Sequence, residues 1–158
     1  MFKGNVILDH IDGTSNKFII ISPFIYENDK YVIQFTPKLQ SDGASVPKIF
    51  WNIFPPISGK YMEAAILHDI LYASHILSKK EADKIFLEAM KDLGVSWWKR
   101  NVMYYAVKFF AIKAWDEKTP QQIQAARKHI KVIRKDKNEK IYYRFNYWAN
   151  NFCGLCNG

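Results

Sequence analysis

The sequence predicts an α+β fold in which a small N-terminal antiparallel sheet precedes a bundle of about four helices. Short runs of β-branched and aromatic residues, separated by turn residues, occupy the first 40 positions. Apolar residues then recur at helical spacing from residue 61 to about residue 134. Because 158 residues is the ordinary size of one domain, we expect a single domain over residues 1–158.

Three strands are expected in the N-terminal part: Val6–Leu8, Phe18–Ile21 and Tyr31–Phe35. Asp12-Gly13 and Glu27-Asn28-Asp29 supply turn residues between them. The following segment, residues 37–60, contains four prolines and two glycines. Since proline interrupts helical hydrogen bonding, this segment is predicted to be a loop.

Two helices are expected directly after this loop. The first covers Tyr61–Ile76, and Glu63 and Ser74 mark its solvent side. Ser78 and Glu81 have the spacing of a capping box, which opens a second helix that ends near Leu93. The two helices are therefore joined by a very short turn, and we expect them to pack antiparallel.

A third helix is expected from Ser96 to about Trp115, and it is apolar almost all round. Such a pattern predicts the central, most buried helix. Its aromatic residues are then core residues: Trp97, Trp98, Tyr104, Tyr105, Phe109 and Phe110. Thr119 and Pro120 open a fourth helix that runs to about Arg134. Residues 141–148 fit a strand as well as a helix.

The positive charge is concentrated in one basic segment, residues 127–144. This segment has eight Lys and Arg residues and two acidic ones, which accounts for +6 of the net charge of +8. It is either a solvated surface or a binding site for nucleic acid, an anionic membrane surface or an acidic protein. The candidate contact residues are Arg127, Lys128, Lys131, Arg134 and Lys135.

No apolar run reaches the roughly 18 residues that a membrane span requires, so no transmembrane segment is expected. The N-terminal residues lack the apolar stretch of a secretory signal. Cys153 and Cys156 form a CxxC pair in the last nine residues, 150–158, with no second pair to complete a zinc site. We expect this segment to be a flexible tail.

His68 is the first candidate for chemistry. At about 100° per residue, it projects away from Glu63 and Ser74 and toward the protein, beside Ala64 and Ala65. A buried polar pair such as His68-Asp69 needs partners. On the second helix, Asp83 lies at the border of the apolar face and at nearly the same height. We therefore predict that His68 and Asp83 lie within hydrogen-bonding distance, as in a general base with its orienting carboxylate.

Three motifs resemble a bacteriophage and prophage family of uncharacterised function. They are the Ser41–Pro47 loop (S-D-G-A-S-V-P), His68–Tyr72 (H-D-x-L-Y) and Ala82–Phe86 (A-D-x-x-F), in that order. The family has Thr where this chain has Ser41, and the resemblance covers about residues 32–104. It implies a phage-encoded protein without an established activity. Its expected partners are other phage virion proteins, and its expected location is the virion or the host cytoplasm.

The same region resembles, more distantly, the secreted and viral-capsid phospholipases A. That resemblance implies that His68 activates water, that Asp83 orients His68, and that Tyr72 holds Asp83. It also implies that Asp69 binds a divalent metal such as calcium, together with the loop that begins at Asp42. The loop departs from the glycine-rich form of those enzymes, and their disulfides have no counterpart here.

Three interpretations of these residues remain open. In the first, they form a hydrolytic or metal-assisted site. In the second, they form a non-catalytic ligand pocket. In the third, they form a buried polar network that fastens the loop to the helices, so that Asp42 caps backbone amides and His68 is a satisfied core histidine. The chain is then a non-enzymatic virion component or host-interaction protein.

Overall fold

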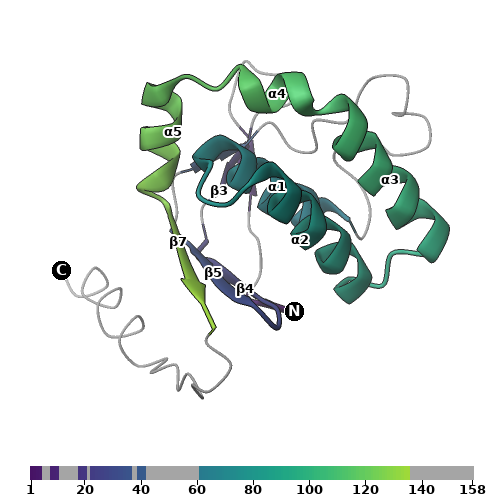
Figure 1. The fold of residues 1–158 in the computed structure, drawn as a ribbon. Coiled ribbons are helices and arrows are strands. Elements are labelled where there is room, and N and C mark those ends of the chain that lie inside the picture. Colours follow the sequence, from purple (N-terminus) through teal and green to yellow (C-terminus); the bar gives the residue numbers. More distant parts are fainter. Residues whose placement is uncertain (5–7, 11–17, 21, 37–38, 42–60, 136–158) are drawn as a thin grey trace, which may run out of the picture.

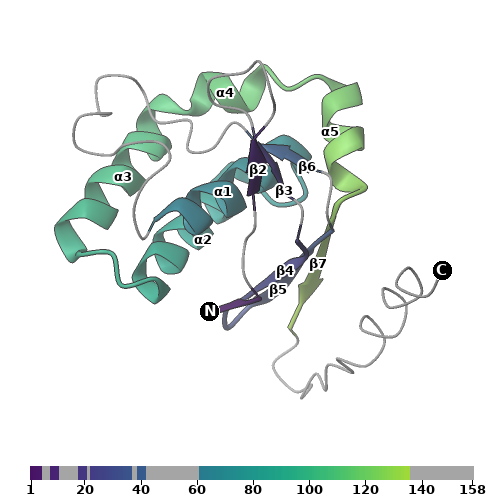
Figure 2. The same cartoon turned by 180° about the vertical axis from the view of Figure 1, so that it is seen from behind.

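A computed structural model describes residues 1–4, 8–10, 18–20, 22–36, 39–41 and 61–135 (Figure 1). Among them, four strands form one antiparallel sheet in the order β1-β4-β5-β7, namely Phe2–Lys3, Phe24–Glu27, Tyr31–Phe35 and Ile130–Arg134. Three short strands form a second antiparallel sheet in the order β2-β3-β6, namely Leu8–His10, Phe18–Ile20 and Leu39–Ser41. This second sheet lies beside the first helix (Figure 2).

Five helices follow in the described residues: α1 (Met62–Ser74), α2 (Lys79–Asp92), α3 (Trp97–Phe110), α4 (Ile112–Asp116) and α5 (Pro120–Arg127). The α+β class is therefore confirmed. Ser78 and Glu81 form the predicted capping box at the start of α2. Thr119 and Gln122 form a second one at α5, with Pro120 in its first turn. No described helix is long and apolar enough to cross a membrane.

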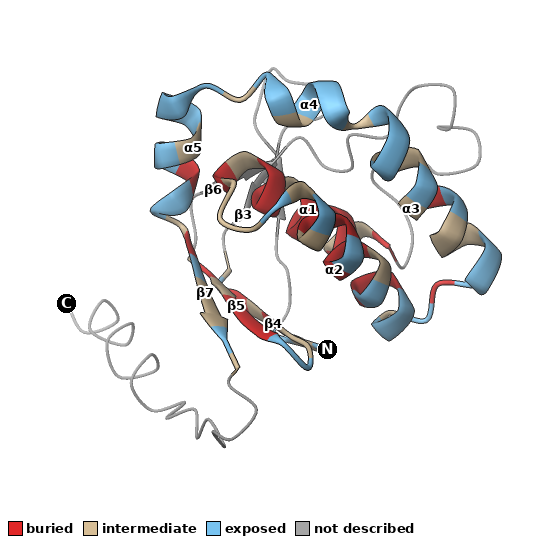
Figure 3. Cartoon of the chain, in the orientation of Figure 1, coloured by how far each residue is buried: buried red, intermediate tan, exposed pale blue. Residues whose placement is uncertain are grey.

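The most buried helix is α1 rather than α3. Nine of the 13 residues of α1 are buried, including Ser74, which was predicted on the solvent side. Residues of β4, β5, α1 and α2 form one continuous core. The prediction that α3 is the most buried helix is wrong: Met103 is its one buried residue. The reason is position, since α3 packs on the outer side of α2 and meets the rest of the chain along one face (Figures 1 and 3).

The predicted fourth helix is also too long, because α5 ends at Arg127 and residues 130–134 form β7. This strand pairs with β5, from Phe35 opposite Ile130 to Tyr31 opposite Arg134. Ile130, Val132 and Ile133 are β-branched, a composition that favours a strand wherever a sheet edge is available for pairing. The predicted third helix is interrupted as well, since α3 ends at Phe110 and α4 begins at Ile112.

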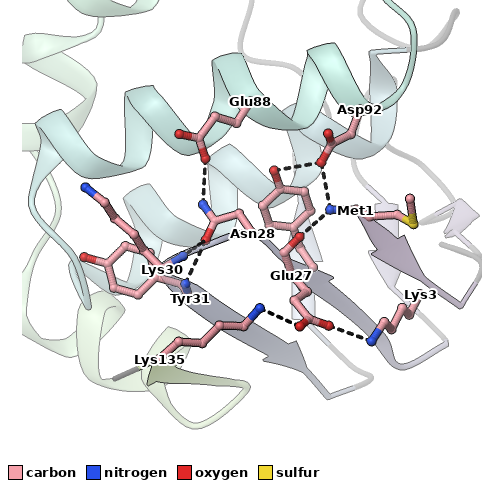
Figure 4. Close-up of polar contacts among 10 residues, drawn as sticks. Met1, Lys3, Glu27, Asn28, Lys30, Tyr31, Glu88, Asp92 and Lys135 are labelled. Atoms are coloured by element: carbon pink, nitrogen blue, oxygen red, sulfur yellow. Dashed lines mark hydrogen bonds and ion pairs between the residues drawn. The ribbon is translucent and has the colours of Figure 1, made fainter. Parts of the chain in front are cut away.

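Polar contacts between the first sheet and α2 fix the layers against each other (Figure 4). The Met1 amino group donates to the Asp92 carboxylate at 2.7 Å, and the Tyr26 hydroxyl donates to the same oxygen at 3.2 Å. The Asn28 side-chain amide donates to Glu88 at 2.6 Å. These contacts hold the sheet along α2, which also packs against α1 and α3.

Candidate functional site

The α1–α2 hairpin builds the candidate site. Residues 75–78 connect the two helices, and His75 adopts the left-handed backbone conformation, φ 46°, that ends α1. The chain then reverses, so α2 runs back along α1 (Figure 1). His68 and Tyr72, one helical turn apart on α1, therefore face residues from the first turns of α2.

Asp83 is the centre of this site. Its side chain is buried, with 4% of its surface exposed, and three donors surround it. Oδ1 accepts hydrogen bonds from Nε2 of His68 at 2.9 Å and from the hydroxyl of Tyr72 at 2.7 Å. Oδ2 lies 2.9 Å from the Lys79 ammonium. The predicted contact between His68 and Asp83 is confirmed, and so is the predicted contact between Tyr72 and Asp83.

Lys79 belongs to this network and was not identified from the sequence. Besides Asp83, its ammonium donates to the backbone carbonyls of Val107 and Lys108, both at 3.2 Å. Lys79 thereby joins α2 to the last turn of α3, where the negative end of the helix dipole attracts a cation. The signal was present in the sequence, since Lys79 and Asp83 have the i, i+4 spacing of a helical ion pair.

His68 is enclosed by aromatic rings. Its ring centroid lies 4.1 Å from that of Tyr72 and 4.8 Å from that of Phe86, and 6% of the residue is exposed. Burial lowers the pKa of His68 more than the hydrogen bond and charge of Asp83 raise it. His68 is therefore neutral at physiological pH. Because the Asp83 carboxylate can only accept, Nε2 carries the proton and Nδ1 carries the lone pair.

The pKa values of Asp83 and Tyr72 are shifted in opposite directions. Burial works to raise the pKa of the Asp83 carboxyl, but hydrogen bonds from His68, Lys79 and Tyr72 outweigh it and leave that pKa below its ordinary value. Burial, followed by the hydrogen bond to Asp83, raises the pKa of the Tyr72 hydroxyl. The site therefore consists of a neutral imidazole, a carboxylate, a phenol and an ammonium.

The described residues do not test the predicted metal site as a whole. Asp42 lies outside them, and Asp69 is half-buried on α1. In the described ranges no three His, Cys, Asp or Glu side chains are grouped as a metal site. Calcium takes 6–8 oxygen ligands. These ranges alone therefore do not fit calcium, and the metal roles of Asp69 and Asp42 stay predictions.

A groove of about 680 Å³ lies at the far end of α1 and not at His68. Its lining includes Tyr31, His75, Trp115 and Arg134. The His75 ring stacks on Trp115 with centroids 3.8 Å apart, and its Nε2 atom is buried without a hydrogen-bond partner. His68, Tyr72 and Asp83 do not line this groove.

The described part of the basic segment makes several contacts within the chain. Arg127 donates to the backbone carbonyls of Ser74 at 2.8 Å and His75 at 3.0 Å, and so caps the end of α1. Lys135 binds Glu27 at 2.5 Å, and Arg134 lies 3.8 Å from Glu81. Lys128 and Lys131 are exposed. Residues 137–144 and the pair Cys153 and Cys156 lie outside the described residues.

Comparisons with known proteins give a family and no activity. A family model described as "Protein of unknown function (DUF1353)" matches residues 18–107. The uncharacterized protein y4jT of Sinorhizobium fredii is 36% identical over 67 residues, which are 42% of this chain and 20% of that protein. The uncharacterized protein y4iH of the same organism is 28% identical over 138 residues, 85% of this chain and 57% of that protein.

The chain thus spans about a fifth of one of these relatives and somewhat more than half of the other. No solved structure matches the chain significantly. The family match includes all four residues of the candidate site, from His68 to Asp83.

Proposed function

We propose that this chain, which belongs to the DUF1353 family, is a hydrolase of carboxylic esters in which His68 is the general base and Asp83 orients it. The observation that carries the proposal is the 2.9 Å contact from His68 Nε2 to Asp83 Oδ1. It holds the imidazole in one tautomer and leaves the lone pair on Nδ1. A neutral, oriented imidazole next to a carboxylate is the arrangement that activates water or a hydroxyl nucleophile.

In the proposed reaction, Nδ1 of His68 takes a proton from water while the water oxygen bonds to the carbonyl carbon of the ester. The tetrahedral intermediate then breaks its bond to the alkoxide oxygen, and the proton on Nδ1 passes to that oxygen. His68 returns to its neutral form. Asp83 stabilises the imidazolium that exists between the two transfers.

Tyr72 and Lys79 support this role through Asp83. Both donate to its carboxylate, at 2.7 Å and 2.9 Å, so the carboxylate keeps its charge and its orientation despite burial. Because Tyr72 and His68 share Oδ1, the phenol also limits rotation of the carboxylate. Neither side chain takes part in proton transfer to the substrate in this scheme.

A second candidate function is structural, and one observation favours it. His68 is 6% exposed and Asp83 3% exposed, values typical of core residues. In this alternative the network fastens α1, α2 and the end of α3, and the chain is a virion component or host-interaction protein. Its phage origin and its location in the virion or host cytoplasm rest on the motif resemblance. Mass spectrometry of purified virions tests both.

The hydrolase proposal is tested with His68→Gln. The Gln amide still donates to Asp83, but it offers no basic nitrogen. Purified wild type is assayed for fatty-acid release from phosphatidylglycerol vesicles and from soluble acyl esters, with and without calcium. We expect release, and a loss of about 10²-fold or more in His68→Gln. Lys84→Gln, an exposed change on the same helix as Asp83, is the control and keeps full activity. Absence of release by wild type, or equal release by His68→Gln, contradicts the proposal.

A further inference from the structure

Helix α3 exposes six large apolar side chains. The large apolar side chains Trp97, Trp98, Val102, Tyr105, Phe109 and Phe110 are between 42% and 70% exposed. Figure 3 shows the exposed side of α3 facing away from the rest of the domain. Scattered exposed apolar residues are ordinary, whereas a contiguous group on one element marks an interaction site.

Four of these residues form one row, which we call the outer stripe: Trp98, Val102, Tyr105 and Phe109. Their spacing of i, i+4, i+7 and i+11 places them on one face of the helix. The rings of Tyr105 and Phe109 stack with centroids 6.1 Å apart. Met103 and Val107, on a different face, supply the contacts with the core. The outer stripe is therefore a second apolar face of α3, separate from the face that contacts the core.

Cations border the outer stripe. At about 100° per residue, Lys99 and Lys108 lie on opposite sides of it. The Lys99 ammonium is 5.4 Å from the centroid of the Trp98 ring. The Lys108 ammonium is 5.7 Å from the centroid of Tyr105 and 5.5 Å from that of Phe109. Residues 97–110 contain no Asp or Glu, so the stripe and its border carry only positive charge.

We propose that the outer stripe of α3 binds the surface of an anionic lipid bilayer. Trp, Tyr and Phe on one face of a helix, with Lys beside them, favour the boundary between headgroups and acyl chains. The lysines can extend their ammonium groups to anionic headgroups while their methylene chains stay on the rings. Trp98 and Phe109 are 11 positions apart, about 16 Å along the axis, so the stripe meets the surface with α3 lying flat on it.

Charge favours an anionic bilayer over a second copy of the chain as the partner of the outer stripe. Two stripes facing each other would bring Lys99 and Lys108 of each copy together, which is repulsive. Single-stranded nucleic acid would also match the charge and could stack on the aromatic rings. Val102, in the middle of the stripe, offers no stacking surface, whereas an acyl-chain boundary accepts it.

Binding of the outer stripe to a bilayer does not depend on the proposed hydrolase activity. It does place the bilayer next to the candidate site, because Lys79 joins Asp83 to the backbone carbonyls of Val107 and Lys108 at the end of α3. His68 is not part of the outer stripe, so His68→Gln should bind vesicles as wild type does. A loss of hydrolysis in that variant leaves membrane binding unchanged, so the two proposals fail separately.

The test is co-sedimentation of the full chain with vesicles of phosphatidylglycerol and phosphatidylcholine, compared with phosphatidylcholine alone. We expect binding to the anionic vesicles and a loss of about tenfold or more in the double variant Trp98→Gln/Phe109→Gln. Lys99→Gln/Lys108→Gln should also weaken binding. Lys84→Gln/Lys91→Gln has the same net charge but changes exposed residues of α2, and it should bind like wild type.

Circular dichroism of each variant is the folding control, and we expect wild-type spectra because the substituted positions lie on the surface. Three outcomes overturn the inference: no binding of wild type to the anionic vesicles, unchanged binding of Trp98→Gln/Phe109→Gln, or equal losses in the two lysine pairs. Two further results would also overturn the proposal, because they assign the outer stripe to another partner. One is a dimer in sedimentation velocity that is lost in Trp98→Gln/Phe109→Gln. The other is binding of oligothymidine that is lost in the same variant, without binding of wild type to vesicles.

Discussion

Nε2 of His68 lies 2.9 Å from Oδ1 of Asp83, across two helices that residues 75–78 join. The pair is buried, and the carboxylate also accepts from Tyr72 and Lys79. Because three donors converge on one carboxylate, changes at each residue should have different consequences for stability. These differences allow the chemistry and the packing of the network to be measured separately.

Replacing His68 should show how much of its role is packing. His68→Ala removes a ring that contacts Tyr72 and Phe86 and one of the donors to Asp83. We expect the free energy of unfolding to fall by about 1–3 kcal/mol, as measured by urea denaturation. His68→Gln retains a donor and should lose less. Equal stability of His68→Ala and wild type would show that the ring contributes little to the fold.

Asp83→Asn should be more damaging than either change at His68. The substitution leaves the Lys79 ammonium, whose side chain is 20% exposed, without its buried counter-charge. Removing one partner of a buried pair costs about 3 kcal/mol. Urea denaturation measures this, with Asp116→Asn at an exposed position as the control. A loss below that of His68→Ala would mean that Asp83 is not the centre of the network.

Lys79→Met should loosen the end of α3. The substitution keeps an apolar chain of similar length but removes the ammonium that binds Asp83 and the carbonyls of Val107 and Lys108. Amide hydrogen exchange should become faster in residues 107–110 and stay unchanged in α5. Lys80→Met, at the adjacent exposed position, is the matched control. Unchanged exchange in residues 107–110 would contradict the connection.

Stability should decrease on acidification, in two stages. Burial holds the pKa of folded His68 below its unfolded value of about 6.5, so the unfolded chain binds a proton that the folded chain does not. The free energy of unfolding therefore falls as pH drops below about 6.5, until the folded pKa is reached. Asp83, whose folded pKa is also lowered, adds a loss at more acidic pH, below about 4.

Burial lowers the pKa of His75 as well, so it contributes in the same direction. The contribution of His68 is the difference between wild type and His68→Gln in urea denaturation at a series of pH values. That difference should change as pH falls below about 6.5. Parallel curves for the two proteins across this range would mean that His68 has the same pKa in the folded and unfolded chains.

The α1–α2 hairpin was predictable because its signals are local. The capping box of Ser78 and Glu81 places the start of α2, and helical spacing on both sides then sets the heights of His68 and Asp83. The burial of α3 was not predictable, because an apolar helix has the same pattern whether its second face meets protein or solvent. β7 was missed because the pairing partner of Ile130–Arg134 is β5, about 100 residues earlier. The metal roles of Asp69 and Asp42 remain predictions.

Native-state acylation of histidines by diethyl pyrocarbonate tests the central claim most directly, because it requires no substrate. The reagent acylates an unprotonated imidazole nitrogen that it can reach, and mass spectrometry assigns the modified residue among the four histidines. We expect acylation of His68 in the folded chain, before any urea is added. Protection of His68 until urea unfolds the chain, while His129 reacts in the folded state, would contradict a general base at His68 and leave the structural role.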